Sequence, residues 1–242
     1  MTDENNVKLE GKLYLIPSTL GETEIDNVIP PYVRNLVNQI DHYIVEEERT
    51  VRRYLRKLNI QKPIDQLKFY IFNEHSDTMQ IPAFINLLKS GLNVGIISEA
   101  GCPCIADPGS PVVSAAHDHN IQVVPLVGPS SIFLALMASG FNGQNFAFHG
   151  YLPKERQARV RKIKEMESNA QKNNQTQLFM ETPYRNNHLL EDLLQTCKDT
   201  MQLCIAQNVS CQTESIKTKS IAGWRKSMPD LNKIPVIFIL FK

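Results

Sequence analysis

Three short turns rich in glycine and proline are the first candidates for chemistry, because each directly follows an apolar run. They are Pro17-Ser18-Thr19-Leu20-Gly21, Ser98-Glu99-Ala100-Gly101-Cys102-Pro103 and Gly128-Pro129-Ser130-Ser131. Glycine lets backbone amides approach a ligand closely, and proline fixes the shape of a turn. The turns therefore predict one shared ligand-binding cleft, or they are only tight connections between strands and helices.

Three carboxylates are candidates for a general base: Glu46, Glu47 and Glu74. A carboxylate near an acceptor hydroxyl can remove its proton. Acidic residues at helix starts are also common partners of the helix dipole, so a structural interpretation stays open for each of them.

Two groups of basic residues could meet phosphates. The first lies at helical spacing on one face, and the alternative is a solvated helix face balanced by the preceding glutamates. The second follows Pro153. Two separate patches favour RNA over a small anionic substrate. The first group is Arg49, Arg52, Arg53, Arg56 and Lys57, and the second is Lys154, Arg156, Arg159, Arg161, Lys162 and Lys164.

Composition gives no support for nucleic-acid binding driven by overall charge. Missing motifs argue against hydride transfer, nucleotide hydrolysis, metalloproteases, α/β-hydrolases and zinc sites. Lysine and arginine total 26 against 25 acidic residues, so no global positive field drives nucleic-acid binding. No G-x-G-x-x-G follows the first apolar run, and no G-x-x-x-x-G-K-S/T, H-E-x-x-H, G-x-S-x-G or paired C-x-x-C occurs. We therefore expect no bound metal, and we expect the five cysteines to be reduced structural thiols.

The elements that position these residues alternate between strands and helices. In the first half, helical spacing occurs around residues 33–40, 51–58, 81–88 and 112–116. Alternation of this kind predicts an α/β fold with a mostly parallel sheet covered by helices. The expected strands are Leu13 to Ile16, Tyr43 to Val45, Phe69 to Phe72, Val94 to Ile97 and Val123 to Leu126.

The second half predicts a mixed sheet, because fewer crossover helices separate its strands. Helices are expected at residues 132–138, 155–167 and 186–197, and the polar stretch Asn169 to Gln177 predicts a loop. We place the domain boundary at Gly128-Pro129, which gives ranges 1–127 and 128–242. The expected strands are Phe146 to Phe148, Leu178 to Glu181, Leu203 to Gln207, Ser215 to Ser220 and Val236 to Phe241.

The turns resemble, in order and spacing, those of the tetrapyrrole methylase superfamily, in particular its branch that methylates ribose 2'-hydroxyls of small-subunit ribosomal RNA. The family's P-T-P-I/L-G-N is matched by Pro17 to Glu22, its E-D-T-R by Glu46 to Arg49 and its N-E by Asn73-Glu74. Its S-D-A-G-T-P and D-P-G are matched by Ser98 to Pro103 and Asp107 to Gly109. Its V-P-L-P-G-P, G-F-L-P and E-S/T-P-x-R are matched by Val124 to Pro129, Gly150 to Pro153 and Glu181 to Arg185.

This resemblance implies two α/β domains of the class III methyltransferase type, with S-adenosylmethionine in the cleft between them. Methyl transfer then depends mainly on aligning the acceptor with the departing sulfur, at roughly 3 to 3.5 Å. The residues it assigns to substrate are Arg49, Arg52, Arg53 and Arg185. Those it assigns to the cofactor are Pro17, Ser98, Glu99, Ala100, Gly101, Ile105, Ala106, Ser130, Ser131 and Met180.

The sequence departs from the family pattern at several chemically distinct positions. Asp of the central turn is Glu99 and the following Thr is Cys102, while R-E-L-T-K reads Gln207-Asn208-Val209-Ser210-Cys211 and K-G-E appears as Lys233-Ile234-Pro235. The changes leave three hypotheses: ribose methylation of ribosomal RNA, methylation of a small molecule such as a tetrapyrrole carbon, or a non-catalytic relative that binds cofactor or RNA.

Partners and location follow from weaker signals. No stretch reaches the roughly 18 to 20 apolar residues of a membrane helix, and Met1 to Glu10 is polar, so we expect a cytoplasmic protein without membrane contact. The resemblance further implies a homodimer.

Overall fold

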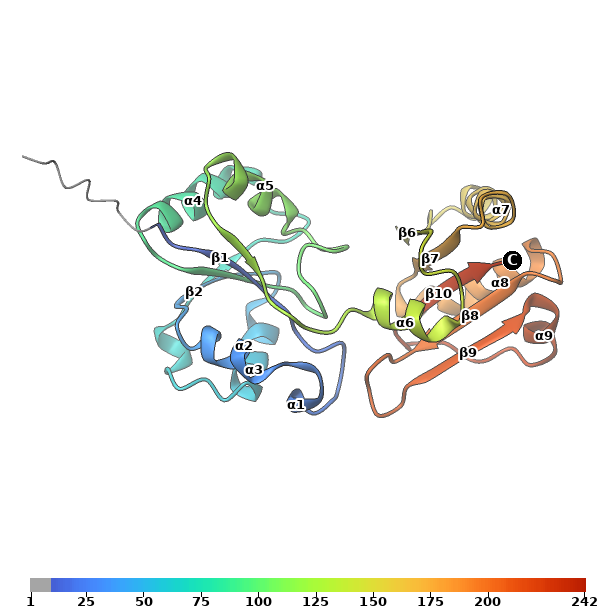
Figure 1. The fold of residues 1–242 in the computed structure, drawn as a ribbon, viewed down its shortest axis with the longest axis horizontal. Helices are drawn as coiled ribbons and strands as arrows, with labels where there is room; N and C mark the ends of the chain where they lie inside the picture. The colour runs from blue at the N-terminus through green and yellow to red at the C-terminus, as the bar shows by residue number, and fades with distance from the viewer. Residues whose placement is uncertain (1–9) are drawn as a thin grey trace, which may run out of the picture. The chain divides into compact units, whose positions relative to one another are not determined.

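The computed structural model describes residues 10–242, so all but the last of the polar residues Met1 to Glu10 lie outside the described residues. The chain forms two compact units (Figure 1). The first unit consists of the chain up to Thr19 together with Thr23–Pro129. The second unit consists of Leu20–Glu22 together with Ser130–Lys242. Among the described residues, no helix combines the length and apolarity that a bilayer span requires.

A parallel sheet of five strands, in the order β3-β2-β4-β1-β5, forms the centre of the first unit. Side chains on both faces are apolar, as expected for a parallel sheet that helices cover on both sides. The strands are β1 (Leu13–Ile16), β2 (His42–Val45), β3 (Lys68–Ile71), β4 (Val94–Ile97) and β5 (Val123–Pro125).

Helices cover the two faces of this sheet in two groups (Figure 1). On one face, α1 (Ile25–Val28), α2 (Pro31–Val37) and α3 (Glu48–Lys57) pack through a cluster that includes Ile16, Tyr43 and Leu55. On the other, α4 (Ile81–Lys89) and α5 (Ser110–Asp118) pack through a cluster that includes Ile44 and Ile96. Successive strand residues point to opposite faces, so each strand serves both clusters. Short 3-10 turns occur at Ile64–Gln66 and Thr78–Gln80.

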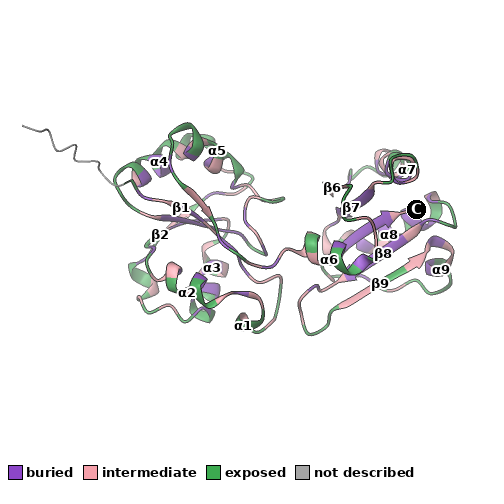
Figure 2. Ribbon diagram, viewed as in Figure 1, coloured by how far each residue is buried: buried purple, intermediate pink, exposed green. Residues whose placement is uncertain are grey.

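The second unit has a mixed sheet of five strands in the order β6-β7-β10-β8-β9. Only β6 and β7 pair in parallel, and the remaining pairs are antiparallel. Figure 2 shows buried residues along β8 and β10 and exposed ones on the edge strand β9. The strands are β6 (Phe146–Tyr151), β7 (Thr176–Met180), β8 (Gln202–Gln207), β9 (Ser215–Ser220) and β10 (Val236–Phe241).

Four helices cover the second sheet. The helix α6 (Ser131–Ser139) packs on one face with Ile237 and Ile239, while α7 (Arg156–Asn173), α8 (Asn186–Thr196) and α9 (Ile221–Lys226) pack on the other with Phe238. A 3-10 turn, Pro183–Arg185, leads into α8. The single tryptophan, Trp224 of α9, is buried and donates from its indole nitrogen to the Leu203 carbonyl at 2.7 Å.

The α/β class and the mixed second sheet are confirmed, and each of the ten strands expected from the sequence is present, with ends that differ by up to three residues. The expected loop at Asn169 to Gln177 is wrong. The helix α7 continues to Asn173 because Ile163, Met166 and Ala170 bury one face of it, and β7 begins at Thr176, whose hydroxyl donates to the Asn142 carbonyl at 2.8 Å. Only Asn174, with φ of 51°, and Gln175 separate helix from strand.

Two short helices, α1 and α9, had no signal in the sequence, because four to six residues are too few to show a 3.6-residue period. All five cysteines are free thiols, as expected.

A buried ion pair joins α7 to α8 in the second unit. The carboxylate of Asp192 accepts hydrogen bonds from Arg159 at 2.8 Å and from Arg156 at 2.9 Å. Arg159 is buried and also donates to the Lys154 carbonyl, whereas Arg156 is mostly exposed. Removing one partner of a buried pair leaves an uncompensated charge.

We therefore expect Asp192→Asn to lower the free energy of unfolding of the second unit by about 3 kcal/mol. Arg156→Gln is the matched control and should cost less than about 1 kcal/mol, because its guanidinium stays largely solvated. Trp224 fluorescence during urea unfolding reports on this unit, since Trp224 lies in its core. Equal losses in the two variants would contradict the structural importance of the Arg159 pair.

Candidate functional site

The register of the first sheet brings three residues that follow strands to one edge. Ile16 and Val45 both pair with Ile97 across parallel strands. Pro17, Glu46 and Ser98 follow directly, so they lie at the same level at the carboxyl end of the sheet.

Hydrogen bonds and close approaches link the three turns to one another. The Ser18 amide donates to the Gly101 carbonyl at 2.9 Å, which joins the first turn to the central one. The thiol of Cys102 lies 3.5 Å from the Pro129 carbonyl and joins the central turn to the third. A side chain at Gly128 would place its Cβ 2.2 Å from Cβ of Pro17, so only glycine allows this approach. Within the first unit the three turns therefore meet, while the expected ligand-binding cleft stays a prediction.

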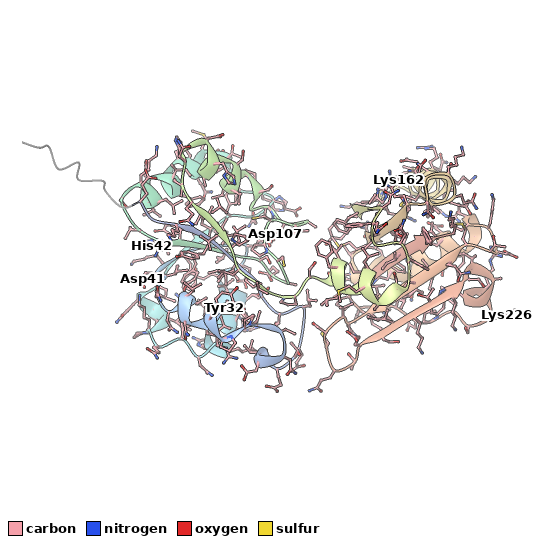
Figure 3. All side chains as sticks on the ribbon, in the orientation of Figure 1. Tyr32, Asp41, His42, Asp107, Lys162 and Lys226 are labelled. Carbon is pink, nitrogen blue, oxygen red and sulfur yellow. The ribbon has the colours of Figure 1, made fainter. Side chains whose placement is uncertain are left out.

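Aromatic hydroxyls hold the first turn and the residue just before the third turn. Tyr54 of α3 is buried and donates to the Pro17 carbonyl at 2.6 Å. Tyr32 of α2, labelled in Figure 3, accepts from the Val127 amide at 3.0 Å. Sequence reasoning missed both tyrosines, because their partners lie 37 and 95 residues away in the chain.

This edge of the sheet is a topological switch point. After β1 the chain continues to the face covered by α1 to α3, whereas after the neighbouring strand β4 it continues to α5 on the opposite face. Adjacent strands whose connections leave in opposite directions open a crevice at their carboxyl ends, which is where open α/β sheets bind ligands.

The central turn carries unusual backbone geometry. Gly101 has φ of 79°, and two residues with side chains, Cys104 and Ala106, have φ of 67° and 57°. Left-handed backbone at residues other than glycine costs energy and concentrates at ligand sites. Asp107 stabilises the turn by accepting from the amides of Cys104 at 3.2 Å and Gly109 at 3.1 Å.

The surface of these turns offers both polar and apolar partners for a ligand. The hydroxyl of Ser18 is buried and has no hydrogen-bond partner among the described residues. Ile105 and Val127 are 47% and 63% exposed, which is high for such apolar side chains. A ligand with one apolar ring and one polar end would therefore find partners for both ends here.

Three carboxylates gather beside the central turn: Glu46, Glu99 and Asp107. Burial, followed by the hydrogen bond and the charge of Asp107, raises the pKa of Glu46 to about 7. Burial and then the charge of Glu47 raise the pKa of Glu99. A carboxyl with a pKa near neutrality can accept and release protons at neutral pH, as a general base must. Asp107, from the D-P-G turn, was not among the site residues expected from the sequence.

The other two base candidates are in different surroundings. Glu47 caps the start of α3, where it accepts from the amides of Arg49 at 2.8 Å and Thr50 at 2.6 Å. The hydrogen bond from the Thr50 hydroxyl and these amide bonds lower the pKa of Glu47. Glu74 lies on the surface, with its carboxylate 3.5 Å from His75. Glu47 therefore matches the helix-start interpretation, and Glu46 has the surroundings of a base.

The exposed face of α3 lines a hollow of about 460 Å³. Arg52 is engaged there: it donates to Glu48 at 2.7 Å and Asp65 at 2.8 Å, and its guanidinium lies over the Phe69 ring. Within residues 10–242, three other arginines of this hollow form no salt bridge: Arg49, Arg53 and Arg56.

Four of the expected site residues belong to the second unit. Ser130 occupies the N-cap position just before α6, and its side chain caps no backbone amide, while Ser131 is the first residue of that helix. Met180 ends β7 and is half-buried. Arg185 forms an ion pair with the buried Glu181 and donates to the Thr182 hydroxyl at 3.2 Å, so its guanidinium is already engaged.

Three members of the second basic group have partners within the second unit. Arg156 and Arg159 hold Asp192, and Lys162, labelled in Figure 3, pairs with Glu165 at 2.8 Å. Among the described residues, no three His, Cys, Asp or Glu side chains converge as metal ligands would.

Comparison with known proteins gives consistent matches along the chain. The model of the tetrapyrrole (corrin/porphyrin) methylases matches residues 26–223. A protein of Thermotoga maritima named ribosomal RNA small subunit methyltransferase I is 30% identical over 94% of this chain and 97% of its own length. Proteins of the same name from Streptococcus pyogenes and Vibrio cholerae are 32% and 29% identical and cover 89% and 92% of this chain, and 70% and 73% of their own lengths.

Solved structures share the fold at low identity. The methyltransferase CobJ superposes with a TM-score of 0.65 at 14% identity, over 96% of this chain and 94% of its own. Uroporphyrin-III C-methyltransferase from Thermus thermophilus, solved as a complex with S-adenosylhomocysteine, superposes with a TM-score of 0.57 at 14% identity, over 96% of this chain and 98% of its own. At this identity the likeness concerns the fold.

The raised pKa of Glu46 makes stability depend on pH. The unfolded carboxyl ionises near 4.5 and the folded one near 7, so folding favours the protonated form. Stability from this group is complete below about pH 4.5 and is lost as pH rises through 7. Glu46→Gln should therefore match the wild type at pH 4.5 and exceed it at pH 8 by about 1 kcal/mol, a value reduced because water screens the half-exposed carboxyl.

Carbon-13 NMR of the glutamate carboxyls measures the midpoint directly. We expect one carboxyl, absent from Glu46→Gln, to titrate near pH 7. Asp107→Asn should move that midpoint toward 4.5 by removing a neighbouring charge. A Glu46 midpoint at the ordinary value would contradict the proposed surroundings.

Proposed function

The chain belongs to the tetrapyrrole (corrin/porphyrin) methylase family, and from this premise we propose that it transfers a methyl group from S-adenosylmethionine to a ribose 2'-hydroxyl of small-subunit ribosomal RNA. One observation carries the proposal: relatives named ribosomal RNA small subunit methyltransferase I match about nine-tenths of the chain or more. The linked turns at the switch point of the first sheet support it, because they offer a built ligand site.

The residues around the turns fit the cofactor. S-adenosylmethionine has an adenine ring, which needs an apolar surface, and an amino-acid end, which needs polar partners. Ile105 and Val127 offer exposed apolar surface, and the Ser18 hydroxyl is buried without a partner among the described residues. We propose that the cofactor is held by Pro17, Ser18, Ser98, Glu99, Ala100, Gly101, Ile105 and Ala106 of the first unit and by Ser130, Ser131 and Met180 of the second.

The cofactor supplies an electrophilic methyl group on a positively charged sulfur. The chain must hold the acceptor hydroxyl in line and accept its proton. We assign the proton to Glu46, whose pKa of about 7 lets its carboxylate take up a proton near neutral pH. The hydrogen bond and the charge of Asp107 favour the protonated form of Glu46, which supports this uptake of the proton. Glu47 and Glu74 are the weaker candidates, because one is committed to a helix cap and the other lies in solvent.

RNA phosphates would be bound by the α3 hollow. Arg49, Arg53 and Arg56 line it without salt-bridge partners among the described residues. Arg52 and Arg185, also expected to bind substrate, have carboxylate partners of their own, so we assign them to orienting α3 and the 3-10 turn before α8. The family resemblance further leads us to propose a homodimer that works in the cytoplasm.

Methyl transfer to RNA tests the proposal. Purified protein, tritiated S-adenosylmethionine and unmodified small-subunit ribosomal RNA or subunits should give labelled RNA whose label survives alkaline hydrolysis within a dinucleotide, because a 2'-O-methyl group blocks cleavage. We expect Glu46→Gln to lower the single-turnover rate by roughly 10²-fold or more. Label released as a mononucleotide would indicate base methylation, and unlabelled RNA would refute the proposal.

Calorimetric titration with S-adenosylhomocysteine provides the control for the cofactor site. Gly128→Ala should weaken binding at least tenfold, since the added Cβ would collide with Pro17. Gly143→Ala adds the same methyl group where nothing lies within 4 Å and should leave binding unchanged.

The arginines of α3 should contribute to the salt dependence of RNA binding. The binding constant K falls as salt rises, so log K has a negative slope against log salt. Replacing Arg53 or Arg56 by glutamine should make this slope less steep, by about 0.7 for each phosphate of single-stranded RNA that the variant no longer neutralises. Lys226→Gln, at an exposed lysine of α9 labelled in Figure 3, makes the same charge change elsewhere and is the control. Equal slopes in all variants would remove α3 from the RNA site.

A further inference from the structure

A separate hollow of about 320 Å³ lies within the second unit. Its walls come from the segment Leu20–Glu22, the loop between β8 and β9, and Pro235 just before β10. The volume lies within the range of small-ligand sites, roughly 300 to 1,000 Å³. Neither the cofactor residues nor the arginines of α3 line it.

The loop that forms one wall is held in a fixed and strained shape. Asn208 and Ser210 have φ of 47° and 65°. Their backbone is held by hydrogen bonds: the Asn208 amide donates to the Pro235 carbonyl at 3.0 Å, and the Ser210 amide donates to Glu214 at 2.7 Å. The Asn208 side chain donates to the Thr213 hydroxyl at 3.0 Å, which orients its amide. Strain retained in this way is typical of ligand sites.

The opposite wall approaches this loop closely. A Cβ at Gly21 would lie 2.7 Å from Sγ of Cys211, so a small residue on each side keeps the hollow open. Burial raises the pKa of the Cys211 thiol, so the thiol is uncharged at neutral pH.

The lining combines apolar and polar groups and has no positive charge. Among the described residues that line it, the amides of Asn208 and Gln212 both donate and accept hydrogen bonds, and the Glu22 carboxylate accepts them. No lysine or arginine is present among them, so phosphate is not the matching ligand. The lining suits a neutral ring with both donors and acceptors on its edge.

We propose that this hollow binds an unpaired nucleobase of the RNA substrate and selects it by hydrogen bonds from Glu22, Asn208 and Gln212. The inference rests on the proposed function for its ligand class. Sequence-specific RNA binding usually reads bases that are free of a duplex, through hydrogen bonds along their edges.

Fluorescence anisotropy with labelled ten-nucleotide homopolymers of A, C, G and U tests the selection without requiring methyl transfer. The wild type should bind one homopolymer roughly fivefold or more tightly than the weakest. Cys211→Met fills the hollow without adding charge and should reduce that ratio below about twofold, whereas Cys211→Ser, a matched small residue, should keep it. Glu22→Gln replaces a carboxylate, which only accepts hydrogen bonds, by an amide that also donates, so it should also alter the ratio of affinities between homopolymers.

Binding of S-adenosylhomocysteine should stay within about twofold of wild type in all three variants, and Trp224 fluorescence checks that the second unit is folded. An unchanged ratio in Cys211→Met, no base preference in the wild type, or cofactor binding lost in a folded variant would overturn the inference. If Cys211→Met does not fold, Glu22→Gln decides, and an unchanged ratio there overturns it.

The two proposals can fail separately. The wild type could prefer one base, and Cys211→Met could lose that preference, while the wild type methylates no ribosomal RNA. This result would support base binding in the hollow and refute the proposed function. Methylation of ribosomal RNA, together with a base preference that these variants do not change, would support the proposed function and refute base binding in the hollow.

Discussion

The first unit depends on the parallel pairing of β1 with β4. In this pairing Leu13 lies opposite Val94, and Ile16 lies opposite Ile97. The pairing is specified by side chains, because Gly95 leaves the space that Ile16 occupies: a Cβ there would lie 2.5 Å from Cδ1 of Ile16. A slip of one residue would turn every apolar side chain of the strand to the wrong face. The same pairing sets Pro17 level with Ser98, so packing in the core decides the geometry of the turns at the sheet edge.

Those turns concentrate features that are costly for stability. Left-handed backbone at Cys104 and Ala106 opposes folding, and so do the ionised carboxylates of Glu46 and Glu99, whose pKa values are raised. Two apolar clusters, one on each face of the sheet, offset this cost. Groups with perturbed pKa values often gather at functional sites, and here they lie at a switch point on a well-packed support.

The two units use arginine differently. In the second unit, Arg159 and Arg225 satisfy backbone carbonyls, the latter at Leu194 with 2.8 Å from its Nε, where α8 ends. Helix ends leave carbonyls without partners, and a charged fork satisfies several at once. In the first unit, Arg49, Arg53 and Arg56 line a hollow without salt-bridge partners among the described residues. The two basic groups are alike in sequence, and only the structure shows which of their members already have carboxylate partners.

The sequence by itself determined the strands, the longer helices, the α/β class and the glycine- and proline-rich turns, because these depend on local periodicity and on backbone conformations that few residues allow. It placed Glu46 among the candidate bases without separating it from Glu47 and Glu74. Only the tertiary structure decided that Glu46 lies beside Asp107, that Tyr54 holds Pro17, and that Asn208, Cys211 and Pro235 line one hollow. The physical reason is that pKa shifts, hydrogen bonds and cavities depend on which residues meet in space, and the residues that meet here lie tens of positions apart in the chain.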